Sequence, residues 1–125
     1  MSGLPEAVSK AWDDRKGPII FTTVDKNGVP NAIYATCVNK SDDGSIIIAD
    51  NYFDKTQKNI FAESKGAILF MTSDEKAFQL KGVIEYHKDG DAFEDMKRWN
   101  PKQHPGHAAV ILRVEEVYSG SAKLL

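Results

Sequence analysis

The sequence predicts a mainly β fold with short helices, an antiparallel barrel formed by one domain over residues 1–125. Several segments rich in β-branched and aromatic residues follow one another with short turns between them, and few helical segments separate them. Strands joined in this way pair as antiparallel hairpins, whereas a doubly wound parallel sheet needs a helix after nearly every strand. A chain of 125 residues also suits one hydrophobic core rather than two.

The first half is predicted to contain a helix, a hairpin and a third strand. Residues 18–24 favour a strand, and Asn27-Gly28 is a strong hairpin signal because both turn positions require positive φ. The return strand is predicted over residues 31–38, and the third strand over residues 45–50. The N-terminal helix is predicted because apolar residues recur at the spacing of one helical face: Leu4, Ala7, Val8, Ala11 and Trp12.

The second half is predicted to alternate helices and strands. A short helix follows Asp54, and a second, amphipathic helix carries Phe93, Met96 and Trp99 on one side before Asn100-Pro101 ends it. Gly82 stands inside a predicted strand, which indicates a β-bulge or the close approach of another backbone. The predicted strands of this half span residues 66–73, 77–88 and 107–120.

Composition and charge argue against several classes of function. Lys and Arg number 16 and Asp and Glu number 18, so the net charge is −2, whereas nonspecific nucleic-acid binding needs a basic surface. The single cysteine, Cys37, excludes an intrachain disulfide and a cysteine-based metal cluster. The apolar runs are far shorter than the roughly 20 residues that cross a membrane. Glu6 and Lys10 interrupt the first apolar segment, so it does not resemble a signal peptide and we expect a cytoplasmic protein.

Common cofactor and metal motifs are absent from the sequence. It contains neither the glycine-rich dinucleotide fingerprint nor a P-loop. His104 and His107 are separated by Pro-Gly, so they are not expected to share a helical face, and a zinc site needs three or four ligands. We therefore predict no metal site.

A candidate anion site stands at the start of the short helix. Asp54 is a suitable N-cap residue, and Gln57 occupies the position of a capping-box partner. Lys55 and Thr56 then fall in the first turn, where free N–H groups, a positive charge and a hydroxyl favour a phosphate. The alternative is an ordinary solvated helix start that carries an unfavourably placed lysine.

Several stretches in a fixed order resemble a known family. Asn51-Tyr52 forms a corner after the third strand, and Lys55-Thr56 opens the following helix, with Asn59 three residues later. Residues 66–70, 79–82 and 108–111 add an apolar strand, a strand that ends in glycine and a late Ala-Ala strand. Together, over about residues 17–125, they resemble the FMN-binding split-barrel family related to pyridoxamine 5'-phosphate oxidase, and most closely its small bacterial FMN-binding proteins.

The resemblance implies an antiparallel split β-barrel of the FMN-binding type, with FMN as the cofactor at a homodimer interface. It implies that the partner subunit completes the site with its residues 104–107 and its C-terminal residues 123–125. The implied FMN contacts are Lys55 and Thr56 for the phosphate; Tyr34, Ala35 and Thr36 for the phosphate, ribityl chain or ring, largely through backbone groups; Asp50 and Asn51 along the flavin edge; and Gln79 as a further polar contact.

The resemblance also limits the function. The oxidase has an arginine and a lysine where this chain has Tyr34 and Asn39, and it ends in an arginine-rich segment that this sequence lacks. A true pyridoxamine 5'-phosphate oxidase is therefore not expected. Three alternatives stay open: an FMN-dependent electron carrier or small oxidoreductase with an unknown redox partner or substrate; a non-catalytic flavin- or haem-binding module, with His87, His104 or His107 as the haem ligand; and an unrelated small barrel with an anion site.

Overall fold

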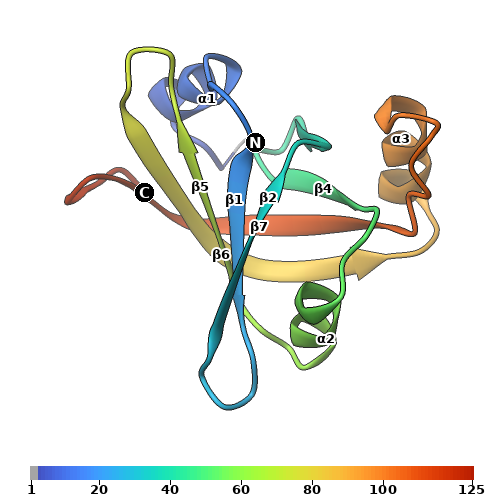
Figure 1. Ribbon diagram of the computed structural model, residues 1–125. Coiled ribbons are helices and arrows are strands. Elements are labelled where there is room, and N and C mark those ends of the chain that lie inside the picture. Colours follow the sequence, from blue (N-terminus) through green and yellow to red (C-terminus); the bar gives the residue numbers. More distant parts are fainter. Residues whose placement is uncertain (1–2) are drawn as a thin grey trace.

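A computed structural model describes residues 3–125 and shows a curled antiparallel sheet with three short helices (Figure 1). No helix within these residues is long and apolar enough to cross a lipid bilayer. The elements are α1 (Glu6–Asp13), β1 (Ile19–Val24), β2 (Pro30–Ala35), β3 (Val38–Lys40), β4 (Ile46–Asp50), α2 (Lys55–Phe61), β5 (Gly66–Met71), β6 (Ala77–His87), α3 (Asp91–Trp99), β7 (Ala108–Ser119) and β8 (Ala122–Lys123).

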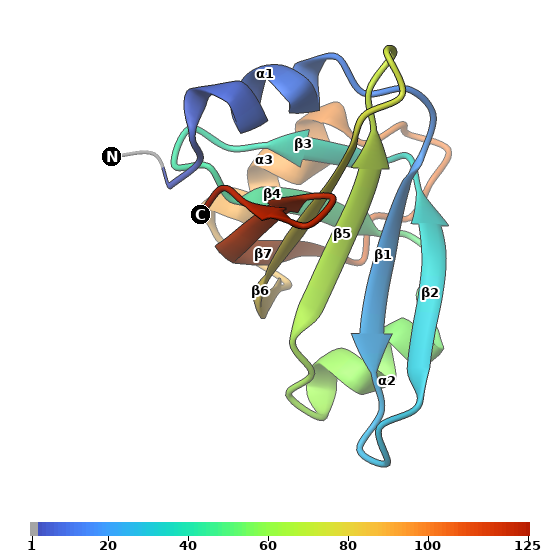
Figure 2. The same ribbon diagram turned by 90° about the vertical axis from the view of Figure 1, so that its left-hand side faces the viewer.

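The strand order explains why the sheet curls. Neighbouring strands pair in the order β2-β1-β5-β6-β7-β4-β3, and β8 adds to β7. The two outermost strands of this path, β2 and β3, are consecutive in the chain and only Thr36 and Cys37 separate them. The sheet must therefore bend until its two edges meet at this short connection (Figure 2). The predicted antiparallel split barrel is confirmed.

The prediction of one continuous strand over residues 31–38 is wrong. The strand stops at Ala35 and resumes at Val38, because β2 pairs with β1 whereas β3 pairs with β4 on the opposite edge of the sheet. A single straight strand cannot pair with both. The break leaves Thr36 and Cys37 outside regular pairing, beside the end of β2.

Apolar side chains fill the inside of the curled sheet, and α1 covers one end of it. Val8 and Trp12 of α1 are buried, and the Trp12 ring meets the Phe70 ring edge-on at 5.3 Å between centroids. The predicted face of α1 is confirmed except at Ala7, which is exposed. The main core comprises Ile19, Phe21, Ile46, Ile48, Ile68, Phe70, Phe78, Leu80, Val110, Leu112 and Val117, together with residues of α1 and α2.

A second apolar cluster covers the outer face of β4 and β7. Met96 of α3 is fully buried there, and Phe93 and Trp99 pack beside it, which confirms the predicted apolar side of this helix. Because α3 covers one face and the main core covers the other, every residue of β4 is buried. This explains why residues 46–50 are uniformly apolar up to Asp50 instead of alternating with polar residues.

Gly82 lies at an irregularity in the pairing of β6 with β7. The register between these strands shifts between Lys81 and Gly82. A Cβ atom at residue 82 would lie 1.8 Å from the carbonyl oxygen of Arg113, which is far inside contact distance. The prediction of a bulge or close backbone approach is confirmed, and only glycine fits there without movement of β7.

We expect Gly82→Ala to lower the free energy of unfolding by about 2–4 kcal/mol, because the added methyl group must push two central strands apart. Chemical denaturation followed by circular dichroism measures the change. Gly3→Ala is the matched control, since the nearest atom to its Cβ would lie 3.9 Å away and its stability should stay within about 0.5 kcal/mol of the parent. Equal effects of the two substitutions would contradict the steric argument.

Candidate functional site

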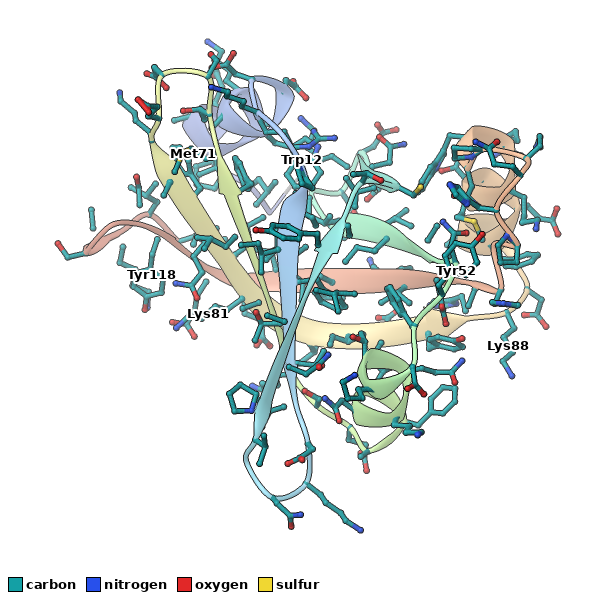
Figure 3. All side chains as sticks on the ribbon, viewed as in Figure 1. Trp12, Tyr52, Met71, Lys81, Lys88 and Tyr118 are labelled. Carbon is teal, nitrogen blue, oxygen red and sulfur yellow. The ribbon has the colours of Figure 1, made fainter. Side chains whose placement is uncertain are left out.

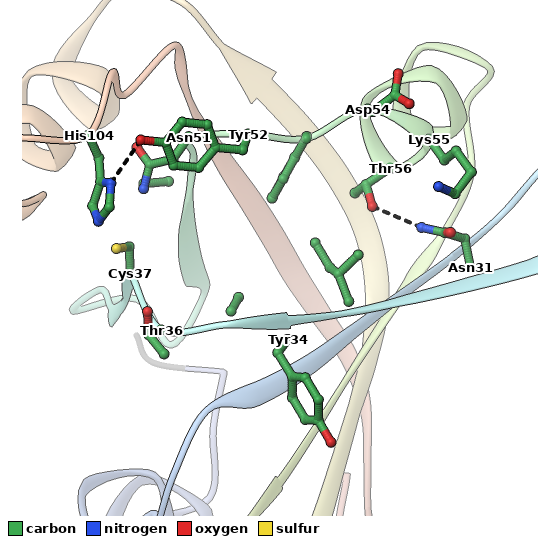
Figure 4. A pocket seen from close by; sticks show the side chains of 14 residues that line it. Asn31, Tyr34, Thr36, Cys37, Asn51, Tyr52, Asp54, Lys55, Thr56 and His104 are labelled. Atoms are coloured by element: carbon green, nitrogen blue, oxygen red, sulfur yellow. Dashed lines mark hydrogen bonds between the residues drawn. The ribbon is translucent and has the colours of Figure 1, made fainter.

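A pocket opens where β2 leaves the sheet, between β2, the corner after β4 and the first turn of α2; we call it the β2–α2 pocket (Figure 4). Its volume is about 370 Å³, within the range of small-molecule sites. Its wall is formed by Asn31, Ile33, Tyr34, Ala35, Thr36, Cys37, Ala49, Asn51, Tyr52, Phe53, Asp54, Lys55, Thr56 and His104.

Most of the site residues predicted from sequence meet at this pocket, although their binding roles remain predictions. Two of them do not line it. Asp50 is buried beneath the corner, and Gln79 lies on β6, opposite Leu69 of β5 and Tyr118 of β7. The pocket brings together the other six: Tyr34, Ala35, Thr36, Asn51, Lys55 and Thr56.

Strand β2 forms one wall of the pocket with its backbone and with the side chains of alternate residues. The Tyr34 side chain points away from the pocket and is 75% exposed (Figure 4). Because side chains alternate along a strand, residues 33 and 35 face the cavity instead. Strand β2 is also an edge strand, so its backbone N–H and C=O groups on the side away from β1 are free to bind a planar polar ligand.

The basic end of the pocket is held by one hydrogen bond between β2 and α2. Asn31 Nδ2 donates to Thr56 Oγ1 at 3.1 Å, and Thr56 is only 1% exposed (Figure 4). Since the hydroxyl oxygen accepts this bond, its proton remains available for an acceptor in the pocket. Lys55 is exposed beside it, and no carboxylate within residues 3–125 forms an ion pair with its ammonium group.

The predicted capping box at the start of α2 is wrong. The Asp54 side chain makes no capping hydrogen bond; it forms an ion pair with Lys58 at 3.5 Å instead. Gln57 turns toward the sheet, where its Nε2 donates to Asp50 Oδ2 at 3.4 Å and to the hydroxyl of Tyr86 at 2.9 Å. Among residues 3–125, therefore, no side chain caps the N–H groups of the first turn of α2, and this turn contains no acidic residue.

Asp50 lies beneath the corner after β4 and does not line the pocket; its place along the flavin edge remains a prediction. Its buried carboxylate accepts from the N–H of Phe53 at 3.0 Å and from the hydroxyl of Tyr86 at 2.6 Å. Its carbonyl accepts from the N–H of His107 at 2.8 Å. Burial, together with the hydrogen bond to Asp50, raises the pKa of Tyr86 to about 12, so this hydroxyl keeps its proton and stays a donor.

The other end of the pocket is held by a pair of buried amides. Asn51 and Asn100 exchange side-chain hydrogen bonds of 2.8 and 3.1 Å, and Asn51 Oδ1 also accepts from the N–H of Gly106 at 2.9 Å. The loop after α3 is thereby tied to the corner after β4. This places His104 at the pocket, where its Nδ1 lies 3.1 Å from the hydroxyl of Tyr52.

His104 therefore lies at the pocket of its own chain, and the expectation that a partner subunit also supplies residues 104–107 remains a prediction. Sequence reasoning also assigned no binding role to the pocket wall at Asn31, Ile33 and Phe53. No local motif marks these residues, because each meets the pocket only through strand pairing or loop anchoring. Within residues 3–125, no three His, Cys, Asp or Glu side chains gather as metal ligands.

Comparison with known proteins assigns the family. The family model described as pyridoxamine 5'-phosphate oxidase matches residues 5–120. An uncharacterized protein of Methanocaldococcus jannaschii is 35% identical over 107 residues, which cover 81% of this chain and 71% of that protein. The match therefore spans nearly the whole domain rather than a single motif.

Several solved structures share this fold, and two of them are named for different ligands. HupZ from Group A Streptococcus has a TM-score of 0.82 at 21% identity and covers 96% of both chains. An FMN-binding protein from Syntrophomonas wolfei has a TM-score of 0.76 at 18% identity and covers 94% of this chain and 97% of that one. A heme binding protein from Mycobacterium smegmatis has a TM-score of 0.70 at 17% identity, covering 93% and 54%.

At these identities the structures establish the fold and leave the ligand open. The family match rests on the sequence, and the antiparallel split-barrel fold agrees with it. The chain belongs to the pyridoxamine 5'-phosphate oxidase family of FMN-binding split barrels.

Proposed function

We propose that the β2–α2 pocket binds FMN and that the protein is a flavoprotein, acting as an electron carrier or as a reductase of a small acceptor. The observation that carries the proposal is that Lys55, which forms no ion pair within residues 3–125, and the Thr56 hydroxyl lie together at one end of a pocket whose wall is a strand edge. An ammonium group and a hydroxyl donor fit a phosphate. A strand edge fits the hydrogen-bonding groups of a ribityl chain and flavin ring.

The residues of the chain bind and orient the cofactor. Lys55 and Thr56 hold the phosphate, the backbone of residues 34–36 contacts the ribityl chain and ring, and Asn51 approaches the flavin edge. Bound flavin supplies hydride and electron transfer, whereas the protein supplies position and surrounding charge. The charges that distinguish the oxidase are replaced by Tyr34 and Asn39, so pyridoxamine 5'-phosphate is not the proposed substrate.

A non-catalytic haem- or flavin-binding module is the second candidate, and His104 favours the haem version. Of the three histidines, His104 lines the β2–α2 pocket. His87 instead pairs with Glu85 at 2.8 Å on β6, and His107 is exposed. A visible spectrum of the purified protein separates the candidates, since flavin absorbs in the near-ultraviolet and blue and haem gives a Soret band. A haem spectrum without flavin would overturn the FMN proposal.

The FMN proposal includes a homodimer, which an uncovered sheet face supports. Strands β2, β1, β5 and β6 place apolar side chains on the face away from the core, including Leu69 at 41% exposure and Met71 at 46%. A solvated sheet face normally carries polar residues. Figure 3 shows Met71, Lys81 and Tyr118 on this side of the molecule.

Two of the predicted FMN contacts share this outer face. Cross-strand pairs align Tyr34, Ile20, Leu69 and Gln79 in one row across four strands, and paired residues point to the same side. Gln79 therefore faces away from its own pocket and toward the proposed partner. The C-terminal residues 122–125 also lie at the opposite end of the molecule from α3 (Figure 1). We propose that Gln79 and the C-terminal residues 123–125 contact the flavin bound in the pocket of the second subunit.

Lys55→Ala should weaken FMN binding by about 1.5–3 kcal/mol, the scale of a charge-assisted hydrogen bond. Thr56→Val should weaken it by about 1 kcal/mol, and Thr56→Ser, which keeps the hydroxyl, should weaken it less. Calorimetric titration of the apoprotein with FMN and with riboflavin measures both effects. Riboflavin has no phosphate, so an equal loss of riboflavin affinity would show that Lys55 does not bind the phosphate.

Leu69→Lys should weaken self-association at least tenfold, because it inserts a charge into the proposed apolar interface. Sedimentation with and without FMN measures it, and FMN should strengthen association in the parent protein. Phe61→Lys is the matched control, since Phe61 is an exposed apolar residue of α2 outside this face. A folded monomer that binds FMN at full stoichiometry would refute the shared site.

Deletion of residues 123–125 should lower FMN affinity about fivefold, the equivalent of one lost hydrogen bond, although these residues lie far from the pocket of their own chain. Leu124 and Leu125 pair with Val117 through backbone hydrogen bonds of 2.8 and 3.1 Å. Thermal unfolding must therefore be measured alongside, to separate loss of binding from fraying of β7. Unchanged FMN affinity in the folded, truncated protein would exclude a role for this segment.

A further inference from the structure

A second pocket lies on the other side of Lys55, between α2 and the hairpin that joins β1 to β2; we call it the hairpin pocket. Its volume is about 620 Å³. It is lined by Asp25, Lys26, Val29, Pro30, Asn31, Lys55, Lys58, Asn59 and Ala62. Figure 2 shows α2 beside this hairpin, at the end of the sheet away from α1.

The two pockets meet at shared residues. Asn31 and Lys55 line both the β2–α2 pocket and the hairpin pocket. The hydrogen bond from Asn31 to Thr56 therefore marks the boundary between them. A ligand whose phosphate reaches Lys55 from the first pocket would continue into the second if it were extended beyond that phosphate.

The hairpin pocket is basic, although the chain as a whole carries a net charge of −2. Three lysines line it, and within residues 3–125 neither Lys26 nor Lys55 forms an ion pair. Lys58 pairs with Asp54, but both side chains are about three-quarters exposed, so that pair is weak and open to competition from a ligand.

Asp25 supplies the one carboxylate among the residues that line the hairpin pocket, and this carboxylate is hydrogen-bonded within its own turn. Asp25 Oδ1 accepts from the N–H of Asn27 at 2.8 Å and from the N–H of Val29 at 2.9 Å. Asp25 thus stabilises the hairpin turn while the lysines remain available. Apolar surface is also present, because Val29, Pro30 and Ala62 belong to the same wall.

We propose that the hairpin pocket binds an anionic nucleotide extension of the flavin, so that the full site takes a flavin dinucleotide in preference to FMN. Lys26 and Lys58 contact the second phosphate, and the wall of Val29, Pro30 and Ala62 contacts the adenosine. The inference rests on the proposed flavin function and extends it, since it states what lies beyond the first phosphate. Charged groups for the phosphates and apolar surface for a nucleoside are the combination that such a ligand requires.

Calorimetric titration of the apoprotein with FMN and with FAD tests the proposal. We expect FAD to bind about tenfold more tightly than FMN, and this advantage to shrink at high ionic strength because it depends on exposed lysines. The double variant Lys26→Gln/Lys58→Gln should lose most of the advantage while its FMN affinity stays within about twofold of the parent. Lys88→Gln, an exposed lysine at the end of β6, is the matched control and should change neither affinity (Figure 3).

The outcomes separate this inference from the function on which it rests. FMN binding without any preference for FAD would overturn the dinucleotide inference alone. A preference for FAD that survives in the double variant and at high salt would overturn the assignment of the second phosphate to the lysines. If neither flavin bound, the proposed flavin function would itself be overturned.

Discussion

The fold depends on one topological constraint: the two edge strands of the sheet are consecutive in the chain. Strands β2 and β3 stand at opposite ends of the strand order, yet two residues join them. A flat sheet would hold its edges several strand spacings apart, at roughly 4.8 Å for each. The sheet must curl to connect them, which encloses the main core and leaves a free strand edge beside the connection. The β2–α2 pocket lies at that free edge, so the site follows from the way the barrel closes.

Buried polar groups give the pocket its fixed shape. Asp50 holds the corner after β4 from below, and the paired amides of Asn51 and Asn100 hold the loop after α3 against it. Asn31 and Thr56 link the opposite wall to α2. Buried polar groups are costly unless they are hydrogen-bonded, so each of these contacts specifies one arrangement of the chain. The pocket is thereby organised before a ligand arrives, and little conformational entropy need be lost on binding.

The charge pattern around α2 connects the two pockets. The chain is slightly acidic overall, but three lysines, Lys26, Lys55 and Lys58, line the pocket where the hairpin, β2 and α2 meet. Acidic residues nearby are engaged elsewhere, with Asp25 in its own turn and Asp50 under the corner. Lys55 therefore places positive charge at both the β2–α2 pocket and the hairpin pocket. A lysine in the first turn of a helix is unfavourable by itself, because its charge opposes the helix dipole. The proposed phosphate ligand would supply the counter-charge.

The sequence alone determined most of the regular elements, because their signals are local. The hairpin at Asn27-Gly28, the apolar face of α3 and the close approach at Gly82 depend on residues near one another in the chain or on one residue's size. The sequence also predicted that Lys55 and Thr56 lie together in the first turn of α2. Only the tertiary structure decided where strand 31–38 breaks, since that depends on which distant strand each half pairs with. It also turned Gln57 inward to Asp50 and Tyr86, placed His104 at its own pocket and put Gln79 on the outer face. These placements result from contacts between residues far apart in sequence, and local propensity carries no information about them.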